Sequence, residues 1–423
     1  MLQGIPCGRT AFLRALLIHR YFWPDSPPYA SMLGTIGADL AAAGHDVAVI
    51  TGQPSRTGDQ AASLPSREQV GALAVRRLPV AAERPGGRGQ LVNLVAFPLA
   101  VAGALALRPR PDVVMCSTAP QVTLGAVVSL VARIRRVPFV YHCMDLHPEI
   151  GRISGEFTNP VLYRVLAWLD RATMRRSSAV VVLSGDMRRS VLLRDPRLAD
   201  RVVVINNFAL PDDGGHAPTP LPPPDPGVLR VVFTGNIGRF QGLENAVAAL
   251  GRLPGHVRVE LVFMGDGRAL IGLAEDSSAY EGVSNISILF VPRGSAEAAR
   301  ELMRSAHLGL VSLVPGVVRY AYPSKTATYA EEGLPLLVVC EGDSELAATV
   351  AERGLGWTAT PGNPETIAVA LTSAWEELTG GDRFVTLRAR VRGYAEESFT
   401  ESALLPRWRE LLATVAAPGK ARS

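Results

Sequence analysis

The feature that most constrains this chain is an alternation between short apolar runs and longer stretches rich in Ala and Leu. β-Branched runs bounded by Gly, Pro or Asp are typical of strands, and the stretches between them have the length of helices. Uniformly apolar strands need cover on both faces, so the alternation predicts parallel α/β sheets. Strands are expected at residues 13–18, 46–51, 72–78, 112–116, 139–142, 179–183, 202–205, 229–234, 259–264, 286–291, 308–313 and 336–339.

One stretch interrupts the alternation. Residues 211–226 read PDDGGHAPTPLPPPDP, which has no apolar periodicity and is typical of a linker. We therefore expect two Rossmann-like, doubly wound parallel-sheet domains facing each other across a cleft, where ligands of such folds bind. A single amphipathic helix is expected over residues 397–415. The expected limits are 1–210 for the N-terminal domain, 211–227 for the linker, 228–395 for the C-terminal domain, and 396–423 for a helix that crosses back to the N-terminal domain.

Charge and cysteine usage narrow the classes of function. A formal net charge of +4 is too small to indicate nucleic acid, but it suits anionic small ligands or an acidic membrane surface. The four cysteines show no paired spacing, which favours free thiols in a reducing, cytoplasmic compartment. The N-terminus does not match a signal peptide, because Arg9 and Arg14 interrupt its apolar stretch.

Residues 91–107 form an uncharged segment of seventeen residues, which raises the possibility of a membrane span. Its length falls short of the roughly 20 residues that a span requires. Pro98 and Gly103 also interrupt it. We therefore expect a buried or surface-resting helix, and a cytoplasmic protein with peripheral contact at the inner face of the membrane as an alternative.

Two glycine-rich turns follow expected strands in the C-terminal half. TGNIGRFQGLE covers residues 234–244, and its glycines allow close backbone approach, so that the next helix could present N–H groups to a phosphate. Arg239 could add a charge-assisted contact. A second turn, Gly265-Asp266-Gly267, could face the same cleft. A strand-to-helix turn without a ligand remains the structural alternative for both, and the spacing is not that of a dinucleotide fingerprint.

A third segment, AYPSKTATY from Ala321, places Pro323, Ser324 and Lys325 at a loop-to-helix junction. A lysine opposes the dipole at a helix N-terminus, and an anion between them would explain its position. Only Lys325 and Lys420 are lysines in a chain that otherwise uses Arg. A solvated surface lysine is the alternative.

In the N-terminal half, VYHCMDLHPEIG ends an expected strand and brings His142, Asp145, His147 and Glu149 within eight residues. Imidazole and carboxylate together can act as general bases or hydrogen-bonding groups. A purely structural polar loop is also compatible with the pattern. The alternating positions do not make a convincing set of metal ligands.

Taken in order, these segments resemble the family 4 glycosyltransferases of GT-B fold, and the bacterial branch that includes fucosamine, polysaccharide and natural-product sugar transferases. The resemblance covers nearly the whole chain. The motifs that carry it are RYFWPD (20–25), GHDVAVIT (44–51), RPDVVMCSTAP (110–120), MDLHPE (144–149), VVVLSGDM (180–187), INNF (205–208), TGNIGRFQGLE (234–244), FMGDG (263–267), PSK (323–325) and EGDSEL (341–346).

The resemblance implies a retaining, metal-independent enzyme that takes a nucleoside-diphosphate sugar, of UDP or GDP type, as a substrate and needs no cofactor. Asp145 and His142 would be catalytic, facing the transferred sugar or the acceptor, and Tyr29 and Glu149 would contact the acceptor. The donor-binding residues that it implies are Gly235, Asn236, Gly238, Arg239, Gly265, Arg293, Ser324, Lys325 and Thr328.

The chain departs from the family pattern at several places. Thr328 stands where a glutamate commonly contacts the donor, so either Thr328 supplies a neutral hydrogen bond, Glu331 or Glu332 compensates, or donor preference differs. Gln241 replaces a common lysine in the first glycine turn. Pro27-Pro28-Tyr29 replaces a Gly-Gly pair on the acceptor side.

Other classes of protein remain open at this point. An NAD-dependent enzyme or a GT-B sugar-nucleotide epimerase shares the fold type, and so does a non-catalytic protein that binds nucleotide sugars. The acceptor is undecided too. A polyprenyl-linked saccharide fits residues 91–107 with Arg76, Arg77, Arg84 and Arg88 beside them, and a small natural-product aglycone fits the aromatic residues between Tyr21 and Tyr29. No nucleic-acid partner is expected, and the oligomeric state is left open.

Overall fold

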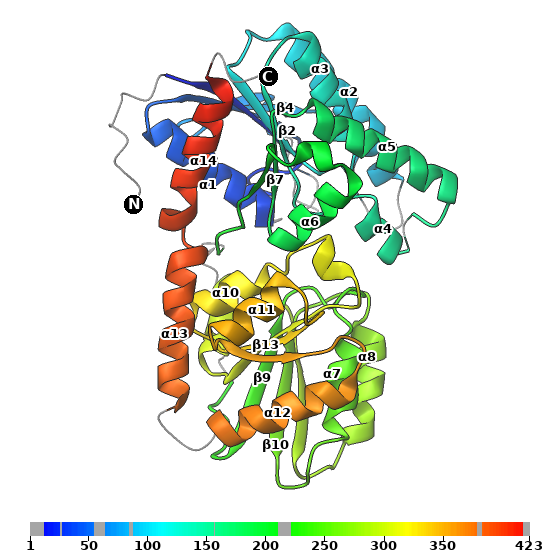
Figure 1. Ribbon diagram of the computed structural model, residues 1–423, viewed down its shortest axis with the longest axis vertical. Coiled ribbons are helices and arrows are strands. Elements are labelled where there is room, and N and C mark those ends of the chain that lie inside the picture. Colours follow the sequence, from blue (N-terminus) through cyan, green and yellow to red (C-terminus); the bar gives the residue numbers. More distant parts are fainter. Residues whose placement is uncertain are drawn as a thin grey trace.

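Two sheets, one above the other along the longest axis, organise the chain (Figure 1). The computed structural model describes residues 12–25, 28–54, 64–83, 88–155, 157–209, 221–378 and 383–417. Residues 211–220 of the expected linker, and Arg84, lie outside the described residues. The α/β fold class with two parallel sheets is confirmed.

The N-terminal sheet has eight strands, all parallel except for the antiparallel pair β3 and β4. β1 lies between β2 and β5, and the strand order reverses there, because the chain returns to the middle of the sheet after β4. In spatial order the strands are β3 (Arg67–Val70), β4 (Leu73–Leu78), β2 (Asp46–Gly52), β1 (Arg14–Ile18), β5 (Val113–Ser117), β6 (Phe139–His142), β7 (Ala179–Val182) and β8 (Val202–Val204).

Alternate residues of these strands enter two different cores. Leu16 and Ile18 pack with helices α2, α3, α5 and α6, whereas Leu17 packs with α1 and α14 on the opposite face. Helices on both faces account for the uniformly apolar strands. The helices of this half are α1 (Pro28–Ala42), α2 (Gly89–Leu107), α3 (Thr123–Ile134), α4 (Glu149–Ile153), α5 (Pro160–Arg176) and α6 (Gly185–Arg194).

The C-terminal sheet has six strands, all parallel, and its order reverses between β9 and β12. Such a reversal opens a crevice at the carboxyl ends of the strands. In spatial order the strands are β11 (Ile286–Val291), β10 (Arg258–Met264), β9 (Val228–Thr234), β12 (Leu308–Ser312), β13 (Leu336–Val339) and β14 (Gly356–Ala359). The helices are α7 (Leu243–Leu250), α8 (Leu270–Ser277), α9 (Ala296–Arg304), α10 (Lys325–Glu331), α11 (Glu345–Glu352) and α12 (Pro364–Leu378).

Two helices complete the chain and run along one side of both sheets (Figure 1). α13 (Arg383–Ser398) packs on the C-terminal core, and α14 (Glu401–Ala416) packs on the N-terminal core, where Trp408 is buried. The single helix expected over 397–415 is therefore wrong at its start. Thr400 separates the two helices because its hydroxyl oxygen accepts a hydrogen bond from the N–H of Ala403, 3.3 Å away, and caps α14.

The uncharged segment 91–107 forms most of α2. By length and composition alone, α2 is the one helix in the described part of the chain that could cross a membrane. Its Phe97, Val101 and Leu105 are nevertheless fully buried in the N-terminal core. The segment is thus a helix that lies on the domain, with one side inward and the other exposed.

Candidate active site

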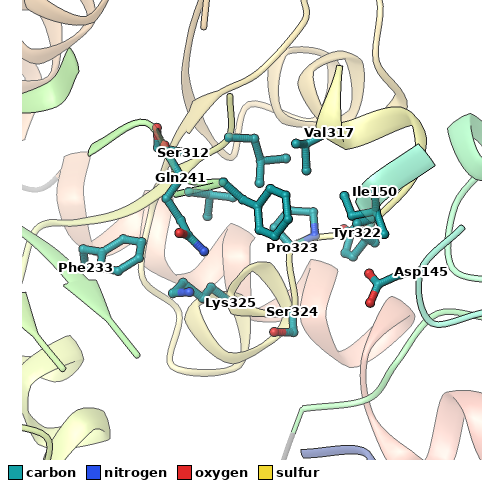
Figure 2. Close-up of a pocket in the computed structure, with 14 residues that line it drawn as sticks. Asp145, Ile150, Phe233, Gln241, Ser312, Val317, Tyr322, Pro323, Ser324 and Lys325 are labelled. Atoms are coloured by element: carbon teal, nitrogen blue, oxygen red, sulfur yellow. Dashed lines mark hydrogen bonds between the residues drawn. The ribbon is translucent and has the colours of Figure 1, made fainter. Parts of the chain in front are cut away.

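A cavity of about 230 Å³ opens at the carboxyl ends of β9 and β12, at the point where the order of the C-terminal sheet reverses (Figure 2). Phe233 near the end of β9 and Ser312 at the end of β12 form its floor. Segments of both halves contribute to the wall. The lining residues are Asp145, Ile150, Phe233, Phe240, Gln241, Val311, Ser312, Leu313, Val317, Ala321, Tyr322, Pro323, Ser324 and Lys325.

Lys325 supplies the positive charge of this cavity. It is the first residue of α10, and its Nζ lies 4.5 Å from the centre of the Phe233 ring. Among the described residues it has no carboxylate within ion-pair distance. Burial lowers its pKa to about 8, because desolvation disfavours the ammonium form. A partly buried ammonium with no counter-ion among the described residues is suited to binding an anion.

The two glycine turns approach each other next to this lysine. The Gly235 N–H donates to the Met264 carbonyl over 2.8 Å, and a Cβ placed on Gly265 would lie 1.9 Å from the Gly235 oxygen. Gly265 therefore has to be glycine for the turns to pack. A Cβ on Gly235 would lie 3.5 Å from the Lys325 Cε, so the turn backbone forms the surface beside the ammonium group.

Gln241 fixes the rest of the first turn. Its side-chain oxygen accepts a hydrogen bond from the Gly238 N–H over 2.9 Å, and its backbone carbonyl accepts one from the Ser312 hydroxyl over 2.5 Å. The side chain that replaces the family's common lysine thus holds the loop instead of adding charge. Lys325 is the lysine that remains at the site.

Asp145 brings a carboxylate from the other half of the chain. It follows β6 and forms an isolated antiparallel bridge with Ala321, while the Leu146 N–H donates to the Tyr320 carbonyl over 2.7 Å. Burial raises the pKa of Asp145 to about 6. Figure 2 shows its carboxylate on the side of the cavity opposite to Lys325, with Ser324 between them.

Further contacts hold the two halves around the cavity. The Ser190 hydroxyl of α6 donates to the Arg319 carbonyl over 2.8 Å, and the Glu345 N–H donates to the Asp186 carboxylate over 2.8 Å. Glu345 returns the contact by accepting from the Gly185 N–H. Because these bonds join segments more than a hundred residues apart, neither half contains the whole site.

His142 and Tyr29 do not reach the cavity. The His142 ring is fully buried beneath Trp408, 4.7 Å away between ring centres, and its Nδ1 lies 2.8 Å from the hydroxyl oxygen of Tyr29. Burial lowers the pKa of His142 to about 3, so the ring stays neutral. These two residues connect the N-terminal sheet with α14 and are closed off from a substrate.

Glu149 is likewise engaged elsewhere. Its carboxylate pairs with Arg194, which also donates to Asp170 over 2.9 Å, and Tyr141 donates to Asp170 over 3.1 Å. This network braces α4, α5 and α6 behind the cavity. Of the four residues expected to act on the sugar or acceptor, only Asp145 lines the cavity.

The expected donor residues divide into two groups. Ser324 and Lys325 line the cavity, and Gly235 and Gly265 form the turns beside it. The others lie farther out: Asn236, Gly238 and Arg239 are on the first turn with Asn236 and Arg239 exposed, Arg293 is exposed and lies 3.7 Å from Asp266, and Thr328 lies one turn into α10, outside the lining.

Glu331 and Glu332 do not compensate for the missing glutamate at Thr328. Glu331 pairs with Arg300 over 2.8 Å, and Glu332 pairs with Arg304 over 3.0 Å. Both carboxylates are thus directed to α9, away from the cavity. The two remaining explanations, a neutral contact from Thr328 and a different donor preference, stay open.

Several lining residues that carry no charge were not predicted from the sequence. Phe233 and Ser312 lie at the carboxyl ends of β9 and β12, and Tyr322 precedes the PSK motif by one residue. The rule that ligands bind at the carboxyl ends of parallel strands would have selected Phe233 and Ser312. Ile150, from α4, had no such signal.

The chain is similar in sequence to known and probable glycosyltransferases. The model of the Glycosyl transferase 4-like domain matches residues 30–207. The probable glycosyltransferase WbjE of Pseudomonas aeruginosa is 26% identical over 267 residues, 61% of this chain and 65% of that relative. The match thus spans just under two thirds of WbjE's length. WcaI of Escherichia coli, named for colanic acid biosynthesis, is 24% identical over 327 residues, 73% of this chain and 78% of its own.

Among solved structures, HepE of Anabaena in complex with UDP and glucose has a TM-score of 0.64 at 16% identity, covering 95% of this chain and all of its own. At this identity the likeness shows the fold alone. The chain is thus similar to family 4 glycosyltransferases over residues 30–207, and it has the GT-B fold.

Proposed function

We propose that this chain is a retaining, metal-independent glycosyltransferase that moves a sugar from a nucleoside-diphosphate sugar to a hydroxyl of its acceptor. The observation that carries the proposal is that Lys325 from one half and Asp145 from the other line opposite sides of a single cavity. A cation suits the diphosphate of the donor, and a carboxylate suits the sugar, where positive charge develops as the bond to phosphate breaks.

The donor is held by protein groups alone. Lys325 binds the diphosphate, the backbone of the turns at Gly235 and Gly265 approaches it, and the exposed Arg239 closes over it. Among the described residues, no group of three or more His, Cys, Asp and Glu is placed to bind a metal ion. HepE, which shares the fold, forms a complex with UDP and glucose, and this supports a UDP-type donor here, with GDP as the other candidate.

The chemistry is a displacement on one face of the sugar. The bond from the anomeric carbon to the diphosphate oxygen breaks, the acceptor oxygen bonds to the same face, and the acceptor proton passes to the departing phosphate oxygen. Lys325 stabilises the charge that the phosphate gains. Asp145 is ionised at neutral pH. Its carboxylate lies near the positive charge that develops on the sugar, and it orients the sugar.

A donor screen with product mass spectrometry tests the function. The protein is incubated with UDP- and GDP-sugars and with two acceptors, a polyprenyl-linked saccharide and a small aglycone, with and without EDTA. We expect one donor to yield a product heavier by one sugar, in equal amount with EDTA. A sugar-nucleotide isomer formed without acceptor would indicate the epimerase instead, and activity that EDTA abolishes and Mg²⁺ or Mn²⁺ restores would contradict the metal-independent proposal.

Asp145→Asn tests whether the N-terminal half acts on the sugar while the C-terminal half binds the diphosphate. Turnover should fall at least a hundredfold, while UDP affinity stays within a few-fold because the diphosphate contacts lie in the other half. Since its raised pKa means that burial opposes ionisation, Asp145 lowers folding stability as pH rises through about 4 to 6. The Asn variant should therefore melt no lower than the wild type at pH 7.

Glu149→Gln is the matched control, a carboxyl-to-amide change four residues away. It removes the charge that pairs with Arg194, so its melting temperature should fall while turnover stays near the wild-type value. If Asp145→Asn loses stability and keeps turnover, Asp145 is a structural brace and the assignment fails.

A further inference from the structure

The outward sides of α2, α3 and α5 carry an unusual number of apolar side chains. Eleven of the eighteen large apolar side chains that are exposed among the described residues belong to these three helices, so the exposure is concentrated and not scattered. We call this surface the apolar helix face. Its main members are Leu91, Val95 and Leu99 of α2, Leu130 of α3, and Val165 and Trp168 of α5.

These side chains form one surface because their helices lie side by side. α2 packs against α3, and α3 packs against α5 (Figure 1). All three bury their inner sides in the same core on one face of the N-terminal sheet. The exposed sides must therefore point away from the sheet in a common direction, and Trp168 is 64% exposed among them.

The exposed charged side chains on these three helices, and at the start of α2, are of one sign. Arg88 at the start of α2, Arg133 of α3, and Arg164 and Arg171 of α5 are exposed. The three helices contain a single carboxylate, Asp170, which is buried and paired with Arg194 over 2.9 Å. An apolar surface bordered by arginines complements the anionic headgroups and the acyl boundary of a membrane.

We propose that the apolar helix face docks this protein onto an anionic lipid bilayer, with the apolar side chains in the interface and the arginines at the headgroups. A second copy of the chain fits less well. A two-fold contact would place the arginine border of one copy against that of the other, and like charges facing each other oppose association.

The helices lie in the plane of the interface and do not cross the bilayer. α2 could span by length and composition, but its Phe97, Val101 and Leu105 belong to the folded core. Its Asn93 donates to the Ala81 carbonyl and accepts from the Ala81 N–H, both over 2.8 Å. Spanning would require this packing to be broken, whereas docking uses only the side that is already exposed.

Docking would also bring the site to the membrane. The exposed apolar residues of α5 lie in its first half, and α5 follows α4, whose Ile150 lines the cavity. A saccharide on a lipid carrier could then reach the cavity from the bilayer. This choice of acceptor rests on the glycosyl transfer proposed above, whereas the docking itself does not.

Flotation of the purified full chain with lipid vesicles tests the docking. We expect it to float with vesicles of phosphatidylcholine and phosphatidylglycerol, much less with phosphatidylcholine alone, and less as salt is raised. The double variant Leu91→Glu/Val95→Glu and the single variant Trp168→Glu should each lower binding at least tenfold. Arg164→Gln/Arg171→Gln should reduce the preference for phosphatidylglycerol.

The matched control is Ile271→Glu/Val369→Glu, which places two charges on exposed apolar positions of the C-terminal half and should leave flotation unchanged. UDP binding by calorimetry, measured on every variant, separates failure of docking from failure of the proposed function. No flotation, equal loss in the control, a dimer that Leu91→Glu/Val95→Glu dissociates, or bound protein that resists alkaline extraction as a spanning protein does would each overturn the proposal.

Discussion

The charge on Lys325 decides whether the cavity attracts an anion, and that charge depends on pH. Because burial lowers its pKa to about 8, the ammonium form is lost as pH rises through that value. UDP affinity, measured by calorimetry, should therefore weaken by roughly eightfold between about pH 7.5 and 9, as simple titration of one group requires. UDP itself gains no further charge on its phosphates over this range.

Lys325→Arg is the control for that titration, because a guanidinium stays protonated throughout this range. The UDP affinity of this variant should not change with pH, whatever its value relative to that of the wild type. Lys325→Ala should bind UDP at least tenfold more weakly than the wild type at pH 7, since a charge-assisted hydrogen bond contributes about 1.5–3 kcal/mol. A wild-type profile that is flat to pH 9 would remove Lys325 from the diphosphate site.

For single residues, the sequence identified the polar side chains that matter but not the directions in which these side chains point. Asp145, His142 and Glu149 belong to one short segment, and only Asp145 lines the cavity. His142 is the last residue of β6 and is covered by Trp408, which is more than 260 positions away in the chain. A contact so distant in sequence leaves no local signal.

Strands were predictable from the sequence where their apolar pattern was strong. Central strands such as β6 and β13 begin and end at the expected residues, because a strand that is buried on both faces forms a continuous apolar run. The two strands that were missed, β3 and β14, lie at sheet edges. β3 reads Arg-Glu-Gln-Val, and β14 begins at Gly356, so neither has the apolar run that defines a strand.

The packing of the glycine turns gives a prediction at the element scale. Gly265→Ala should lower the free energy of unfolding by about 1–3 kcal/mol or more, because its Cβ would collide with the Gly235 carbonyl. Its φ of +150° also disfavours any residue with a side chain. The turn at Gly235 would have to move from beside Lys325, so UDP affinity should fall as well.

Gly272→Ala is the comparison, since a Cβ there would meet nothing within 4 Å in α8. It should raise stability by about 0.5–1 kcal/mol, because alanine is the better helix former. Urea unfolding and UDP calorimetry on both variants check the pair. Equal stability of the two variants would show that the turns can separate without cost.

For the whole molecule, two helix N-termini meet at the boundary between the halves. Asp186 in the first turn of α6 accepts from the Glu345 N–H at the start of α11, and Glu345 accepts from the Gly185 N–H at the start of α6. Each helix therefore receives an acid at its positive end from the other half. This reciprocal contact favours the closed arrangement that brings Asp145 opposite Lys325.

Asp186→Ala/Glu345→Ala should open the molecule without unfolding either sheet. We expect a larger radius of gyration by small-angle X-ray scattering and a turnover at least tenfold lower, because Asp145 no longer faces the bound donor. UDP affinity should stay within a few-fold, since Lys325 and the glycine turns lie together in one half. Glu352→Ala, an exposed acid at the other end of α11, is the control and should change none of these quantities. An unchanged radius with full turnover in the double variant would mean that the backbone bridge at Ala321 and the α14 packing hold the halves closed by themselves.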